Sequence, residues 1–153
     1  MTGPRSSDIL IDELFETTMR LRTYVDARLS GHGMSVARLR FLRTLATSPE
    51  PLRMRDLGDI LNIAARTVTT MADTLEREGL VTRLRHPEDR RAYLLTLTDL
   101  GRSRHIEAEQ VDREALASAT GGLADQDRAT LRRLLGVLRA TVADTSSAPS
   151  EKD

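Results

Sequence analysis

Apolar side chains recur at the three-to-four-residue spacing of an α-helix along most of this 153-residue chain. Ser35 and Thr98 support the segmentation, because each stands as an N-cap immediately before a helical stretch. The helices that we expect cover residues 8–29, 36–47, 54–61, 64–78, 99–120 and 125–143. The pattern therefore predicts a mainly α-helical fold of about six helices.

After the fourth of these helices the pattern changes to that of a small β-hairpin. Gly79 ends the helix, because glycine enters the left-handed conformation at low cost. Leu80 and Val81 return to the core, and an extended segment follows. A turn rich in Pro, Glu, Asp and Arg then leads to a second strand at residues 92–98. Together with the helices before it, the hairpin predicts a central module over residues 35–98.

The helix at residues 64–78 has two contrasting faces. The apolar face consists of Val68, Met71, Ala72 and Leu75. The opposite face carries Arg66, Thr70, Asp73, Thr74 and Arg77. A helix that offers arginine and threonine outward, followed by an arginine-tipped hairpin, is typical of DNA recognition. The helix would fill the major groove, and the hairpin would reach along the backbone into the minor groove.

The first and last helices are amphipathic but have no obvious partner inside the central module. Their apolar stripes consist of Leu10, Leu14, Leu21, Val25 and Leu29, and of Leu131, Leu134, Leu135, Leu138 and Val142. The helix at residues 99–120 is less clearly amphipathic, since only Ile106, Val111 and Leu116 stand among its charges and alanines. The same helices of a second copy would cover these faces, so we expect a homodimer.

These patterns predict a simple division of the chain. Residues 8–34 and 99–145 form a helical dimerisation region, residues 35–98 form the DNA-binding module, and residues 1–7 and 146–153 are flexible tails.

Composition narrows the class of protein further. Cysteine is absent, the first residues lack the apolar run of a signal peptide, and no stretch approaches the length of a membrane span. We therefore expect a soluble, cytoplasmic protein.

Short motifs follow one another in a fixed order through the central module. They are MRDLGDIL at 54–61, TVT at 67–69, LEREGLV at 75–81, Arg83, DRR at 89–91 and LTDLG at 97–101. The DRR motif followed by L-T-x-x-G is specific in this context, whereas either half alone would be weak. From about residue 35 to residue 101, the chain resembles the MarR-type winged helix-turn-helix transcriptional regulators.

The resemblance implies a dimer whose two wings straddle a pseudo-palindromic DNA operator. It also implies a regulator, which we expect to be a repressor, that is released by a small aromatic or phenolic anionic ligand. By the same similarity, Asp89 pairs with Arg91 and aims it at the minor groove, and Arg90 lies beside it at the phosphates. The chain departs from the family at Arg53 and Ala64, where the helices that follow lack a side-chain N-cap.

The expected DNA-binding residues fall into three groups. In the recognition helix they are Arg66, Thr67, Thr69 and Thr70, where arginine can fork onto guanine and threonine can touch a phosphate or a thymine methyl. The expected phosphate contacts are Arg53, Arg55 and Arg83. The wing contributes Asp89, Arg90 and Arg91. The alternative for each of these residues is an ordinary solvated surface position.

The effector site is expected at Tyr24, His32, Met34 and Arg38. By family similarity this region lines a crevice between the dimerisation part and the DNA-binding part. An imidazole, a phenol and a guanidinium could hold a carboxylate or phenolate there. The alternative is that Tyr24 and Met34 pack in the interior and that His32 is an ordinary loop residue.

No enzyme motif, cofactor site or metal site is expected. His32, His86 and His105 lack the spacing of metal ligands, and there is no glycine-rich phosphate loop. One alternative function remains open. With 23 basic and 23 acidic residues the formal net charge is zero, which permits a winged-helix module that docks another regulator rather than DNA.

Overall fold

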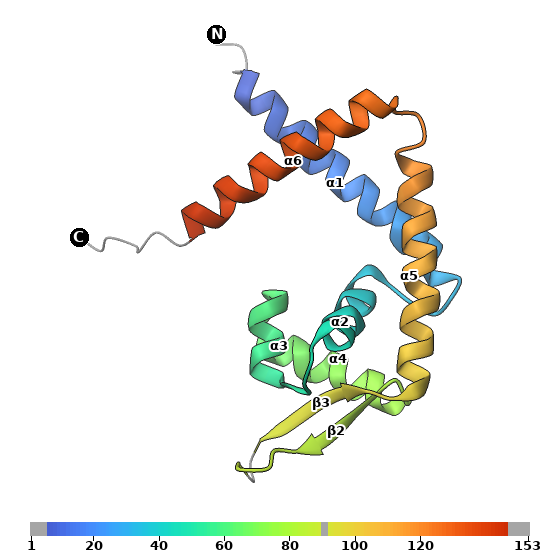
Figure 1. Ribbon diagram of the computed structural model, residues 1–153, viewed down its shortest axis with the longest axis vertical. Helices are drawn as coiled ribbons and strands as arrows, with labels where there is room; N and C mark the ends of the chain where they lie inside the picture. The colour runs from blue at the N-terminus through green and yellow to red at the C-terminus, as the bar shows by residue number, and fades with distance from the viewer. Residues whose placement is uncertain (1–5, 90–91, 147–153) are drawn as a thin grey trace, which may run out of the picture. The chain divides into compact units, whose positions relative to one another are not determined.

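A computed structural model of the chain describes residues 6–89 and 92–146 (Figure 1). Within these ranges it contains six helices and three short strands, which confirms the predicted fold class. The elements are α1 (Ser6–Ser30), α2 (Val36–Thr47), β1 (Leu52–Arg53), α3 (Met54–Leu61), α4 (Ala65–Arg77), β2 (Val81–Arg85), β3 (Tyr93–Leu97), α5 (Asp99–Ala119) and α6 (Asp125–Ser146).

The hairpin strands belong to a three-stranded antiparallel sheet with the order β1-β3-β2. Strand β2 pairs with β3 from Val81 opposite Leu97 to Arg85 opposite Tyr93. Strand β1 was not expected from the sequence, because two residues are too few to display the alternation that marks a strand. It adds to the other edge of β3 and so fixes the start of α3 against the sheet.

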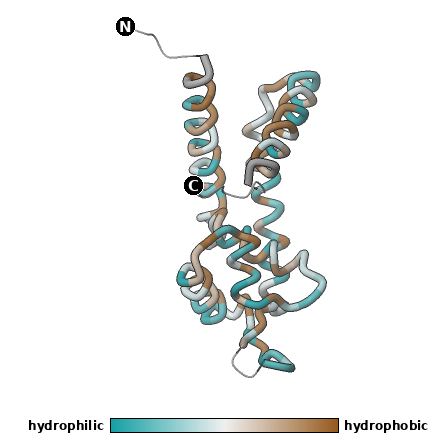
Figure 2. The backbone as a smooth tube through the Cα atoms, turned by 90° about the vertical axis from the view of Figure 1, so that its left-hand side faces the viewer, coloured by the Kyte–Doolittle hydropathy of each residue, from teal (hydrophilic) through white to brown (hydrophobic). Residues whose placement is uncertain are grey.

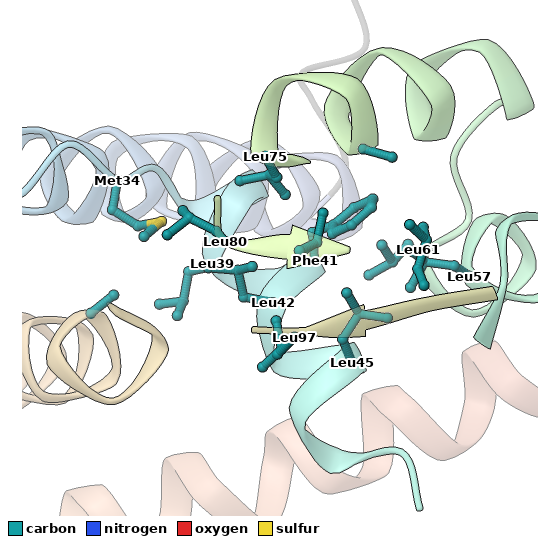
Figure 3. Close-up of a cluster of buried hydrophobic side chains, with 14 of the residues drawn as sticks. Met34, Leu39, Phe41, Leu42, Leu45, Leu57, Leu61, Leu75, Leu80 and Leu97 are labelled. Carbon is teal, nitrogen blue, oxygen red and sulfur yellow. The ribbon is translucent and has the colours of Figure 1, made fainter. Parts of the chain in front are cut away.

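The core of the module lies where α2, α3 and α4 meet the sheet. Figure 3 shows Phe41 and Leu42 from α2, Leu57 from α3 and Leu75 from α4 converging there, and all four are fully buried. The inward residues of β3 close this cluster, since Leu95 is also fully buried. No charged or polar residue is buried among those described. This core holds the outward face of α4 in a defined orientation.

Two residues in the left-handed backbone conformation make the sharp turns before and after α4. Asn62, at the end of α3, has a φ of 52° and begins the turn of the helix-turn-helix. Gly79 has a φ of 74°, which confirms that it ends α4 in the left-handed conformation. Neither α3 nor α4 has a side-chain N-cap, as their starting residues predicted.

The L-T-x-x-G motif joins the sheet to α5 by two specific contacts. The Thr98 hydroxyl oxygen accepts a hydrogen bond from the backbone N–H of Gly101, with 2.9 Å between oxygen and nitrogen, and so caps α5 as predicted. A Cβ atom at Gly101 would lie 1.9 Å from the carbonyl oxygen of Leu80, so a side chain at this position would force the backbones apart. Glycine is therefore required where α5 crosses the start of β2.

The packing face of α5, for which the sequence pattern is weak, consists of small residues. Its buried residues are Gly101, Ala108 and Ala115, spaced seven apart, whereas Ile106 is 64% exposed. Small side chains allow a helix to approach its neighbours closely, and they carry little hydrophobic signal in the sequence. The larger apolar residues of α5 therefore lie mainly outside the core of one chain.

The chain divides into two compact units, residues 1–116 and 117–153. In the first unit, the end of α1 is anchored by Val25 and Leu29, which are buried. The first half of α1 exposes its large apolar residues, and hydrophobic positions recur along it in Figure 2. These exposed residues are Ile9, Leu10, Ile11, Leu14, Phe15 and Met19.

In the second unit, α6 likewise exposes its apolar stripe. The exposed residues are Leu131, Leu134, Leu135, Val137, Leu138 and Val142. A helix with such a stripe gains stability only when another surface covers it. Among the described residues, no helix is both long enough and apolar enough to cross a lipid bilayer.

Candidate nucleic-acid interface

The first two turns of α4 present a polar surface. Arg66, Thr67, Thr69 and Thr70 are all exposed there. Val68 and Ala72, on the other face of the helix, are fully buried, so the core fixes the direction in which the exposed face points. The structure thus brings together the four residues predicted for the recognition helix.

Arg83 lies between the recognition helix and the hairpin. Its guanidinium donates hydrogen bonds to the carboxylates of Asp73 and Glu76 on α4, and its side chain is 23% exposed. The hydrogen bond to Asp73 raises the pKa of Arg83 above its ordinary value. Both terminal nitrogens of Arg83 are engaged in these contacts. They therefore favour a structural role, in which Arg83 links β2 to α4, over the phosphate contact that was expected from the sequence.

The loop that joins β2 to β3 in the wing is organised around His86. Its Nδ1 atom accepts the backbone N–H groups of Glu88 and Asp89 at 3.2 and 3.1 Å. Its Nε2 atom lies 2.7 Å from Nη2 of Arg53. A neutral imidazole accepts through only one ring nitrogen at a time, so the ring can satisfy either the loop or Arg53. Arg53 therefore lies beside the wing, although it comes from β1.

The predicted wing contacts are described only in part. Asp89 is exposed, and its carbonyl oxygen accepts the N–H of Ala92 at 3.0 Å, which closes the turn. Arg90 and Arg91 lie outside the described residues, so the predicted pairing of Asp89 with Arg91 stays a prediction. Arg55, on α3, is exposed, and its Nε atom lies 4.0 Å from the carboxylate of Asp59.

The charges near α4 are distributed unevenly. Arg83 engages Asp73 and Glu76, and Arg38 of α2 pairs with Glu78. Arg66, by contrast, has no ion pair within the described part of the chain. The acidic groups at and near the end of α4 are thus paired with arginines of α2 and β2. A chain of zero net charge can therefore still present an unpaired arginine at the start of α4.

Three of the four predicted effector residues border one cavity. His32, Met34 and Arg38 line a space of about 420 Å³ together with Gly33, Glu78, Leu80, Leu100 and Arg104. Arg38 pairs with Glu78 on this wall, while its Nε atom is buried without a partner among the described residues. Tyr24 is not part of the lining. Its hydroxyl accepts a hydrogen bond from Arg28 at 3.1 Å.

A second ion-pair cluster joins α2 to α5. Arg43 donates to the carboxylates of Glu109 and Asp112, the latter at 2.9 Å, and His105 lies 3.1 Å from Glu109. The hydrogen bond from Arg43 lowers the pKa of Glu109 below its ordinary value. This cluster braces α5 against the winged-helix module.

Sequence reasoning missed the acidic partners and the wing histidine. By pattern alone, Glu76 and Glu78 are ordinary helix charges, yet the carboxylate of each accepts a hydrogen bond from an arginine of another element. The proximity of Arg83 to α4 could have suggested its pair, because a single glycine turn separates the helix from the strand. The role of His86 depends on the path of β1, which the sequence pattern did not reveal. The described residues contain no cluster of three or more potential metal ligands.

Comparisons with known proteins agree with this geometry. Residues 34–93 match the model of the MarR family. The uncharacterized HTH-type transcriptional regulator YdgJ of Bacillus subtilis is 40% identical over 82 residues, or 54% of this chain and 49% of that protein. The match therefore spans about half the length of that relative. The HTH-type transcriptional repressor YetL of the same organism is 24% identical over 126 residues, or 82% of this chain and 75% of that protein.

A solved structure extends the similarity to nearly the whole chain. The transcriptional repressor CouR, bound to a 23-mer DNA duplex, aligns with a TM-score of 0.78 and 25% identity. The alignment covers 94% of this chain and 98% of that chain. The similarity therefore includes the terminal helices as well as the winged helix.

Proposed function

We propose that the chain is a homodimeric repressor of the MarR family of transcriptional regulators, whose family model matches its residues 34–93 and whose fold it shares with the DNA-bound repressor CouR. Each subunit would place residues 64–78 in a major groove and its wing in the adjacent minor groove. The two half-sites of a pseudo-palindromic operator would then lie about one helical turn apart. A cytoplasmic location would follow from this proposal, since the protein would act where the operator DNA lies.

The observation that carries the proposal is the exposed start of α4. Arg66 and three threonines project there from a helix whose other face is locked into the core. The acidic residues farther along the helix are paired with Arg83 and Arg38, so they oppose the approach of phosphates less. Arginine can fork onto the O6 and N7 atoms of guanine, which makes Arg66 the best candidate for reading a base.

The homodimer is supported by the exposed apolar faces of α1 and α6. Phe15 on α1 is 68% exposed and Val142 on α6 is 65% exposed, and each stands among other exposed apolar residues. The structurally similar repressor CouR provides an example of a regulator bound to duplex DNA. A second copy of the chain would cover these faces and would supply the second recognition helix that a palindromic site requires.

The proposed effector is a small aromatic or phenolic anion in the cavity beside Arg38. Arg38, Arg104 and His32 offer positive or potentially positive groups there, against the single carboxylate of Glu78. An anion that draws Arg38 away from Glu78 would break the ion pair that holds the end of α4 to α2. We expect benzoate to raise the melting temperature of the wild type, and Arg38→Gln to lose the shift. An equal shift in both would place the anion elsewhere.

Replacing Arg66 by alanine tests the DNA-binding proposal. Arg66→Ala should weaken binding to the preferred duplex by about 1–3 kcal/mol and relax the preference at one base pair. Arg55→Ala, on the neighbouring helix α3, serves as the comparison because a phosphate contact weakens binding to all sequences alike. Fluorescence anisotropy at several salt concentrations measures both. Unchanged binding in Arg66→Ala would remove α4 from the mechanism.

A further inference from the structure

The exposed threonines of α4 differ in what their hydroxyl groups are doing. Thr69 donates its hydroxyl proton to the carbonyl oxygen of Ala65 at 3.0 Å. Thr70 does the same to the carbonyl oxygen of Arg66, also at 3.0 Å. Within the described residues, the hydroxyl of Thr67 makes no hydrogen bond. Thr67 is only the third residue of α4, so no helical carbonyl lies four residues before it.

This difference decides which chemistry each side chain can offer to DNA. A threonine hydroxyl has a single proton to donate. Phosphate oxygens only accept hydrogen bonds, so a hydroxyl whose proton is already bound to the helix has nothing to donate to them. Thr67 keeps its donor, whereas Thr69 and Thr70 are left with a methyl group and an acceptor oxygen.

The surroundings of Thr70 favour the methyl group. Thr70 borders a mostly apolar hollow of about 260 Å³, lined also by Arg38, Thr67, Met71, Thr74 and Leu75. In the major groove, thymine is distinguished by its C5 methyl group, which makes apolar contacts with threonine methyls. A hollow edged by methyl and thioether groups provides the apolar environment that a second methyl would enter.

Resting on the proposed DNA-binding function, we propose that Thr69 and Thr70 read thymine through methyl–methyl contact, while Thr67 donates to a phosphate. The recognition helix then uses two different signals on adjacent turns. Arg66 reads a guanine by hydrogen bonding, and the threonines after it select for a thymine methyl. The half-site would therefore contain thymine next to the guanine that Arg66 contacts.

A selection from random duplexes tests this inference and does not require the operator sequence to be specified in advance. One pool is synthesised with thymine and a matched pool with uracil, which lacks only the C5 methyl group. The wild type should enrich thymine at one or two positions in the first pool and lose that preference in the second. Replacing the selected thymine by uracil should weaken binding about fourfold for each methyl removed.

Matched variants separate the methyl from the hydroxyl. Thr70→Ser keeps the hydroxyl and removes the methyl, so its binding should no longer respond to the thymine-to-uracil exchange at the position that Thr70 contacts. Thr70→Val keeps methyl groups and removes the hydroxyl, so its thymine preference should remain. Thr67→Ser retains its donor and should behave like the wild type on both pools.

The outcomes distinguish failure of this inference from failure of the proposed function. If no sequence is enriched in either pool, specific DNA binding itself is contradicted. If one sequence is enriched equally in both pools, DNA binding stands and the thymine-methyl contact is overturned. Enrichment of adenine or cytosine, with loss of that preference in Thr70→Val, would instead make the hydroxyl oxygen the reading group.

Discussion

The winged-helix module and the terminal helices are both rich in leucine, but they bury it very differently. In the module, Leu42, Leu57 and Leu75 are 0% exposed. On α6, Leu134 and Leu138 are 46% and 44% exposed. The module therefore completes its core within one chain. The terminal helices have apolar faces that one chain leaves uncovered.

This contrast separates the two parts of the proposed function. A self-contained core can hold α4 rigidly whether or not a partner is present, so base reading would be a property of each subunit. The spacing between two recognition helices would be a property of the proposed dimer, and the terminal helices would set it. Substitutions in the two regions should therefore affect different quantities: association of the subunits for the terminal helices, and unfolding free energy for the module.

The largest effect is expected from charging the stripe on α6. Leu134→Asp combined with Leu138→Asp would place two carboxylates in an apolar interface, and burying an unpaired charge is strongly unfavourable. We expect the proposed dimer to weaken by about a hundredfold or more. Analytical ultracentrifugation measures the association, and circular dichroism tests whether the module remains folded. A variant that stays dimeric would show that α6 is not the interface.

Leu57→Ala is the counterpart of that experiment inside the module. Removing a fully buried leucine side chain should cost about 2–5 kcal/mol of unfolding free energy, because it leaves a cavity. Below the unfolding transition, the association of the subunits should be unchanged. Urea titration and sedimentation distinguish the two effects. If both variants lost stability and association together, the division between module and terminal helices would be wrong.

The smallest effect is expected at the brace between α2 and α5. Glu109→Gln removes the carboxylate that accepts Arg43, at a cost of about 1–3 kcal/mol at neutral pH. Because the pKa of Glu109 is lowered in the folded protein, its contribution is present above the unfolded carboxylate pKa. The contribution is lost as the pH falls through the lowered value. The stability difference between wild type and variant should therefore shrink on acidification.

Glu107→Gln is the matched control for the brace. Glu107 lies two residues away on α5 and pairs with Arg104 at 3.3 Å, with both side chains about half exposed. Such a surface pair contributes about 0–1 kcal/mol. Chemical denaturation of both variants between about pH 7 and pH 3 gives the comparison. Equal losses at the two positions would show that the α2–α5 cluster adds no specific support.

The helices and the recognition face could be predicted because their signals are local. Val68, Ala72 and Leu75 recur along one continuous helix, and Gly79 marks its end in the sequence itself. The packing of α5 was not predictable in the same way. Ala108 and Ala115 contribute to close approach rather than to hydrophobicity, so a pattern of apolar residues does not detect them.

The candidate site shows the same limit. Arg66 could be placed on the outer face of α4 by periodicity alone, and the structure agrees with that placement. The engagement of Arg83 depends on how β2 returns along α4, which is a tertiary arrangement. Whether a threonine hydroxyl is free or bonded to its own helix also depends on backbone geometry. Residue type predicted which side chains are exposed, and the fold determines which of them retain a free donor.

The most direct test of the account is the mass of the complex formed with a selected DNA duplex. One chain has a mass of 17.0 kDa, and sedimentation with fluorescently labelled duplex counts how many chains bind. The account predicts two chains on each duplex, joined through the terminal helices, with tight binding only to the dimer. A single chain that binds the same duplex with full affinity would contradict it.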